Sequence, residues 1–68
     1  MTKLEKAIKN KGLKKKWIAD QLGINDKTLN SFLKYDKINQ VINFVTLIDL
    51  LTLDKNEIFK EILDKKNN

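Results

Sequence analysis

Apolar residues recur at intervals of three and four along most of the chain, which is the spacing of one buried face of an α-helix. The first such set is Leu4, Ala7 and Ile8. It predicts a helix over about 2–10, with the hydroxyl of Thr2 as its N-cap. The chain therefore begins its first helix within a few residues of its start.

A second helix is predicted over about 14–22 and a third over about 26–34, and only a short turn separates them. Gly23 suits the end of the second helix because glycine adopts the left-handed conformation at little steric cost. Asn25 is a favourable N-cap for the third helix. We expect Trp17 to be buried in the core or half-buried. The apolar positions that define the two helices are Leu13, Trp17, Ile18 and Leu22, then Leu29, Phe32 and Leu33.

Two further helices are predicted over about 40–51 and 55–65. The second of these begins like a capping box, with Asp54 as the cap and Glu57 three residues later. No segment alternates as a strand would, and no repeat or linker interrupts the pattern. We therefore expect an all-α chain that forms a single domain over 1–68. The fourth helix is defined by Val41, Phe44, Val45, Ile48 and Leu51, and the fifth by Ile58, Phe59, Ile62 and Leu63.

The charge of the chain is positive and uneven. All fourteen basic residues are lysine, and the formal net charge is +5. Residues 1–37 hold ten lysines against four acids, whereas residues 38–68 hold four lysines against five acids. Such an asymmetry indicates an anionic polymer contacted by one face, although a merely solvated lysine-rich surface has the same composition.

Several classes of protein are disfavoured by what the sequence lacks. It has neither cysteine nor histidine, so it has no disulfide, no thiolate metal site and no histidine base. Its carboxylates are scattered and it has no glycine-rich phosphate loop. We therefore expect no enzyme activity, no metal and no cofactor. No apolar run approaches the roughly 18 residues of a membrane span, and the start does not read as a signal peptide. We expect a protein of the bacterial cytoplasm or nucleoid.

The two helices around Gly23 have the arrangement of a helix-turn-helix, whose second helix fits the major groove of DNA. At these residues the chain resembles the Cro and lambda-repressor-like (XRE-like) helix-turn-helix family. The resemblance runs from about Leu4 to Phe59. It rests on Ile18-Ala19, Leu22-Gly23, Ile24-Asn25, Thr28-Leu29 and the closing segment 47–59.

The resemblance implies a five-helix domain of lambda-repressor-like type that regulates transcription by binding double-stranded DNA. A small Cro-type repressor of a phage or mobile element would be such a protein. Lysine donates to guanine, asparagine pairs with adenine, and aspartate accepts from cytosine, although Asp26 would equally serve as a local cap or charge partner. The implied base-contacting residues are Asp26, Lys27, Asn30 and Ser31. The implied phosphate-contacting residues are Lys15, Asn25, Lys34, Lys37 and Asn39.

The chain departs from the family pattern at three positions. Lys14 stands where a serine or threonine commonly caps the second helix, so that cap is missing. Tyr35 stands where a glycine commonly ends the third helix, and Asn39 replaces a common proline. The geometry after the third helix is thus left open, and Tyr35 is expected either to donate to a phosphate or to pack on the surface.

An apolar stripe of Ile58, Ile62 and Leu63 continues beyond the usual end of the fold, and we expect it to form a dimer or partner interface. A homodimer would place two recognition helices about 34 Å apart, on successive major grooves. Two alternatives stay open. One is a protein-interaction module, such as an anti-repressor or a repressor partner. The other is an antitoxin that binds both DNA and a toxin. Binding to a membrane surface is disfavoured because the lysines do not lie opposite an apolar stripe on one long helix.

Overall fold

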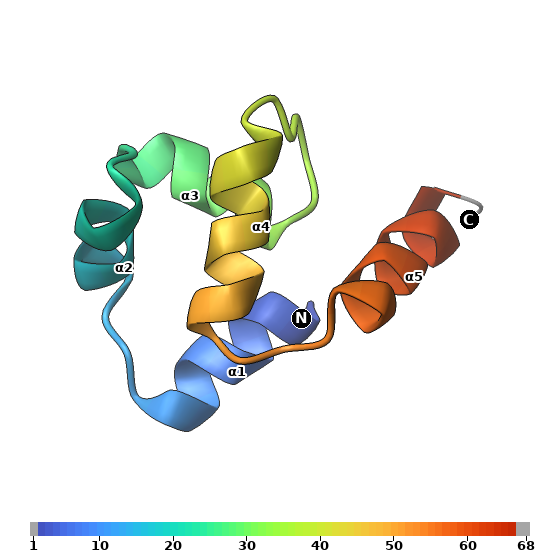
Figure 1. The fold of residues 1–68 in the computed structure, drawn as a ribbon, viewed down its shortest axis with the longest axis horizontal. Helices are drawn as coiled ribbons and strands as arrows, with labels where there is room; N and C mark the ends of the chain where they lie inside the picture. Colours follow the sequence, from blue (N-terminus) through green and yellow to red (C-terminus); the bar gives the residue numbers. More distant parts are fainter. Residues whose placement is uncertain (1, 67–68) are drawn as a thin grey trace.

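The computed structural model describes residues 2–66, which form five α-helices and no strand (Figure 1). In Figure 1, α4 stands in the middle, with α2 and α3 on one side, α1 across its lower end and α5 on the other side. The predicted all-α architecture is confirmed, and each predicted helix boundary lies within one residue of the observed one. The helices are α1 (Lys3–Lys11), α2 (Lys15–Leu22), α3 (Asp26–Leu33), α4 (Val41–Leu50) and α5 (Lys55–Lys66).

The hydrophobic core draws at least one fully buried side chain from every helix. Leu4, Ile18, Phe32, Phe44 and Ile58 come from α1 to α5 in turn, and each is at most 1% exposed. The rings of Phe32 and Phe44 meet edge to face with their centroids 5.5 Å apart, an arrangement that aromatic pairs favour. Helices this short are unstable alone, so their stability comes from this shared core.

Two expectations about apolar residues are wrong. Ile58 is only 1% exposed, so it lies in the core and presents no surface to a partner, whereas Leu63 on the same helix is 60% exposed. Trp17 is 43% exposed and is not a core residue. Its spacing from Leu13 was misleading because Leu13 precedes α2, and helical periodicity does not continue across a loop. Within α2 the buried residues are Ile18, Ala19 and Leu22, and Trp17 lies on the opposite side of the helix.

Local hydrogen bonds account for the helix ends. Thr2 and Glu5 form a full capping box at α1, with the Glu5 amide donating to Oγ1 of Thr2 and the Thr2 amide donating to the Glu5 carboxylate. The hydrogen bond from the Thr2 backbone is the largest cause of a lowered pKa at Glu5. At α5, Asp54 accepts from the Asn56 amide across 2.9 Å. Gly23 ends α2 with φ +67°, as its position in the sequence predicted.

The start of α2 lacks a side-chain cap, as the sequence predicted: Lys14 occupies the N-cap with extended backbone angles and makes no capping hydrogen bond. Replacing Lys14 by serine should supply this bond and raise the free energy of unfolding by about 0.5–1 kcal/mol. Lys16→Ser is the matched control, because it removes the same charge inside the first turn without creating a cap. Urea unfolding of the two variants measures the difference, and equal stabilities would contradict the capping argument.

Candidate nucleic-acid interface

The outward face of α3 is built by the helical period of its sequence. Leu29, Phe32 and Leu33 are buried, and Lys27 and Ser31 are spaced four residues apart on the opposite side of the helix. The Lys27 side chain is exposed and Ser31 is half-buried. An ammonium group and a hydroxyl group therefore lie next to each other on the surface of α3.

The turn before α3 is held by backbone and side-chain hydrogen bonds. The Ile24 amide donates to the Ala19 carbonyl across 3.0 Å, which closes the end of α2. The side-chain oxygen of Asn25 accepts from the Thr28 amide across 2.7 Å, which caps the start of α3. Asn25 thus has a structural role in the turn. The cap uses the side-chain oxygen of Asn25 and not its side-chain amide nitrogen.

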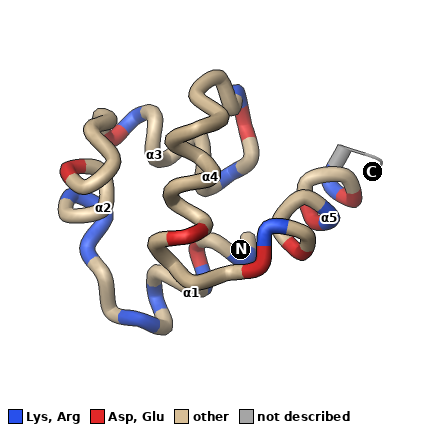
Figure 2. The backbone as a smooth tube through the Cα atoms, viewed as in Figure 1, with Lys and Arg blue, Asp and Glu red and all other residues tan. Residues whose placement is uncertain are grey.

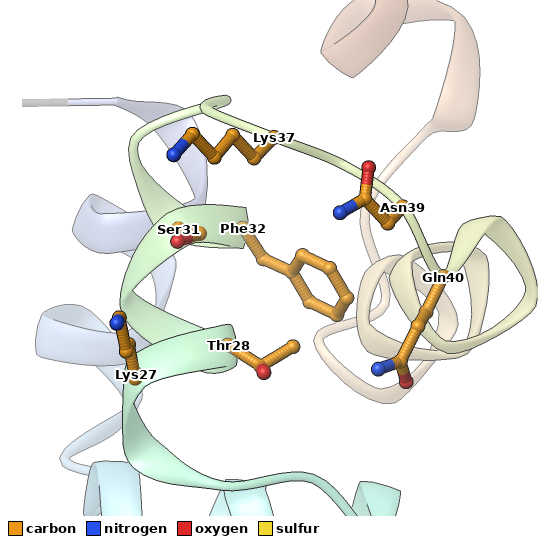
Figure 3. Close-up of a pocket in the computed structure, with 7 residues that line it drawn as sticks. All are labelled: Lys27, Thr28, Ser31, Phe32, Lys37, Asn39 and Gln40. Carbon is orange, nitrogen blue, oxygen red and sulfur yellow. The ribbon is translucent and has the colours of Figure 1, made fainter.

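A groove runs between α3 and the segment that leads into α4 (Figure 3). Its volume is about 150 Å³. In Figure 3, Lys27 and Ser31 extend from α3, and Lys37 and Asn39 extend from the connecting segment. The Phe32 ring lies between α3 and this segment. No lining residue is acidic, and the full set is Lys27, Thr28, Ser31, Phe32, Lys37, Asn39 and Gln40. The groove therefore combines two cationic groups with several neutral hydrogen-bonding groups.

The connecting segment is held in an uncommon backbone conformation. Tyr35 and Lys37 have φ values of +59° and +50°, a left-handed region that costs a residue with a side chain roughly 1 kcal/mol. The Asp36 amide donates to the Ser31 carbonyl across 2.8 Å, and the Asn39 amide donates to the Lys37 carbonyl across 2.9 Å. These bonds return the chain toward α3 and bring Lys37 and Asn39 to the groove.

Tyr35 is not a surface residue, so both roles expected for it are wrong. Its side chain is only 8% exposed, and its hydroxyl donates to Oε1 of Glu61 across 2.5 Å. Its ring also packs edge to face against Phe44, with 6.3 Å between the centroids. Burial, and then the hydrogen bond with Glu61, raise the pKa of the Tyr35 hydroxyl. Tyr35 therefore anchors the end of α3 in the interior.

Glu61 joins α5 to this anchor. The same oxygen that accepts from Tyr35 also accepts from the Lys3 amide across 2.8 Å. Burial raises the pKa of Glu61, but the hydrogen bonds from Tyr35 and Lys3 and the charges of Lys3 and Lys6 outweigh it, so the net pKa is lowered. Glu61 is therefore held as a carboxylate between α1, α5 and the end of α3.

The structure brings four of the nine predicted DNA-contacting residues to one groove and leaves five outside it. Lys27, Ser31, Lys37 and Asn39 line the groove. Lys34 lines a different pocket together with Glu61 and Lys65, and the ammonium group of Lys65 donates to its carbonyl. The other four are exposed, at the starts of α2 and α3 or along α3: Lys15, Asn25, Asp26 and Asn30.

Gln40 is a groove residue that the sequence did not reveal. Its side-chain oxygen accepts from the Asn43 side chain across 2.5 Å, at the start of α4. The available signal was its position directly after Asn39, at the predicted beginning of a helix. The Tyr35–Glu61 contact had no such signal, because the two residues are 26 positions apart.

Charged residues are distributed differently along α1 and along α5 (Figure 2). Acidic and basic residues are mixed along α5, whereas lysines predominate along α1 and into the start of α2.

In residues 2–66 no group of acidic side chains is placed to hold a metal ion. Across the same residues, every helix is too short or too polar to cross a membrane.

Comparisons with known proteins do not assign this groove a role: no family model, no curated protein and no solved structure matches the chain.

Replacing Glu61 by glutamine should make the fold less sensitive to acid. The lowered pKa means that the carboxylate stabilises the fold above the ordinary carboxyl pKa, and that this contribution is lost as the pH falls through the lowered value. Glutamine keeps an acceptor oxygen but does not titrate. Wild type should thus lose more unfolding free energy than Glu61→Gln between about pH 6 and pH 3.

Urea unfolding at several pH values in this range measures the effect. Glu57→Gln is the control, because Glu57 is exposed and pairs with Lys3 only across 3.9 Å. Parallel pH profiles for wild type and Glu61→Gln would contradict the assigned role of Glu61.

Proposed function

We propose that the chain is a sequence-specific regulator of transcription that binds double-stranded DNA through α3. The observation that carries the proposal is the groove, where Lys27 and Ser31 of α3 lie beside Lys37 and Asn39. Two lysines and several neutral hydrogen-bonding groups on one surface suit a ligand that offers both phosphates and base edges. The family resemblance further suggests the type of regulator. It would be a small Cro-type repressor of a phage or mobile element that acts in the bacterial cytoplasm or nucleoid.

In this proposal α2, the turn and α3 act as a helix-turn-helix, and α3 enters the major groove. The turn at Gly23 and the Asn25 cap support this reading, because they leave the first turn of α3 exposed. Lys27 would donate to guanine, and Ser31 would donate to or accept from a base edge. Asp26 and Asn30 flank Lys27 and Ser31 along the helix. Asp26 also stabilises α3, because its negative charge lies in the first turn, near the positive end of the helix dipole.

Phosphate contacts would supply most of the affinity. Lys37 and Asn39 reach the groove from the segment before α4, and Lys15 lies exposed in the first turn of α2. Each neutralised phosphate releases condensed counterions, so binding should weaken steeply with added salt. With no arginine in the chain, guanine recognition lacks its usual bidentate donor. A homodimer that places two α3 helices on successive major grooves would compensate for modest affinity.

Exposed apolar residues favour a second candidate function, binding to another protein. At the start of α4, Val41 is 59% exposed and Ile42 is 82% exposed. On α5, Phe59 is 41% exposed and Leu63 is 60% exposed. A protein-interaction module, such as an anti-repressor, or an antitoxin would cover such residues with its partner. A stable protein complex without an operator footprint would favour this candidate over the regulator.

Gel-shift titrations with the promoter next to the gene, and with random DNA, should separate the roles of two lysines. Lys27→Ala should lower the preference for the promoter by about 1–3 kcal/mol, because it removes a base contact. Lys60→Ala is the control: it removes the same charge from an exposed position on α5. Equal losses on the two DNAs for Lys27→Ala would show that Lys27 does not read bases.

Lys37→Ala should instead weaken binding to all sequences alike. Because it removes one phosphate contact, the slope of log affinity against log salt should become shallower by about 1. Fluorescence anisotropy at four or more salt concentrations measures this slope. An unchanged slope would remove Lys37 from the proposed interface.

A further inference from the structure

A polar seam joins α5 to the end of α3, on a different part of the molecule from the groove. It is lined by Thr2, Glu5, Lys34, Tyr35, Glu61, Asp64 and Lys65. Within it, Glu61 accepts hydrogen bonds from the Tyr35 hydroxyl and the Lys3 amide. The Thr2 hydroxyl donates to the Leu33 carbonyl across 2.6 Å, and the Lys65 ammonium donates to the Lys34 carbonyl. Side chains of α5 and of the α1 cap thus satisfy the last carbonyls of α3.

Tyr35 links the seam to the groove, because it lines the seam while Lys37 and Asn39, which follow it in the chain, line the groove. This residue leaves α3 with a positive φ and is followed directly by Asp36 and Lys37. A left-handed conformation at a residue with a large side chain persists only where its surroundings impose it. Here Phe44 holds the ring and Glu61 holds the hydroxyl. The chain leaves the end of α3 at Tyr35, and the hydrogen bonds of the Asp36 and Asn39 amides then bring Lys37 and Asn39 to the groove.

We propose that Glu61 is a positioning residue of the candidate interface, which acts by fixing the Tyr35 hydroxyl so that the segment after α3 brings Lys37 and Asn39 to the groove. The effect on DNA binding rests on the proposed function, whereas the effect on the segment does not. Glu61 itself lines the seam and not the groove. It therefore acts through Tyr35 and not by touching DNA.

Glu61 can be tested separately from the attachment of α5 because other residues attach the helix. Ile58 is buried in the core, and Ile62 packs against it. Glu57 provides a matched control on α5, since its exposed carboxylate makes only the surface pair with Lys3, and such pairs contribute little to stability. Glu61→Ala and Glu57→Ala remove the same charge, so a general gain in attraction to DNA would affect both equally.

The first readout needs no DNA. In ¹H–¹⁵N spectra, Glu61→Ala and Tyr35→Phe should both shift the amide signals of Lys37 and Asn39, whereas Glu57→Ala should leave them in place. Tyr35→Phe keeps the ring in the core and removes only the hydroxyl, so it serves if Glu61→Ala fails to fold. Glu61→Gln keeps an acceptor oxygen and should leave both signals close to their wild-type positions. Unmoved Lys37 and Asn39 signals in the folded variants would overturn the proposal.

The second readout is affinity for the promoter fragment as a function of salt. Glu61→Ala and Tyr35→Phe should bind about threefold to tenfold more weakly, with a slope shallower by about 1, because Lys37 no longer reaches its phosphate. Glu57→Ala should bind as well as wild type or slightly better. Equal affinities for Glu61→Ala and Glu57→Ala would overturn the effect of Glu61 on binding. A wild-type chain that binds no DNA would overturn the proposed function, and the amide signals would still decide the role of Glu61.

Discussion

The packing and hydrogen bonding of Tyr35 connect the end of α3 to α4 and α5. Its ring lies against Phe44 of α4, and its hydroxyl reaches Glu61 of α5, which in turn accepts from the first turn of α1. The backbone of Tyr35 also follows the C-cap of α3 and begins the segment that lines the groove. The core of so short a chain is small, and this polar connection supplements it.

The same connection explains how a chain without glycine after α3 can still turn sharply there. Glycine adopts a positive φ freely, whereas tyrosine must be forced into it. The cost is offset by burial of a large ring and by a hydrogen bond to a carboxylate, which is stronger than one between neutral groups. The result is a segment whose conformation depends on α4 and α5. A glycine at this position would leave the segment freer to move.

Charge and geometry support the proposed function in different ways. The lysine excess of residues 1–37 points to a polyanion but does not say which surface meets it. Two of these lysines, Lys27 and Lys37, line the groove together with neutral hydrogen-bond donors and acceptors. Lys34 belongs to the same lysine-rich half of the chain but lines the seam with α5 and not the groove, so charge alone does not identify the groove residues. The exposed apolar residues at the start of α4 and on α5 are what supports the second candidate, binding to another protein.

The sequence by itself determined the five helices and their ends, because helical periodicity, the Thr2 and Asn25 caps and the glycine that ends α2 act over three or four residues. It also indicated the outward face of α3, since that face follows from the residues opposite Leu29, Phe32 and Leu33. Only the tertiary structure decided that Ile58 is buried, that Trp17 is exposed and that Tyr35 bonds to Glu61. Those outcomes depend on how separate helices pack, and contacts between residues far apart in the chain leave no local pattern to read.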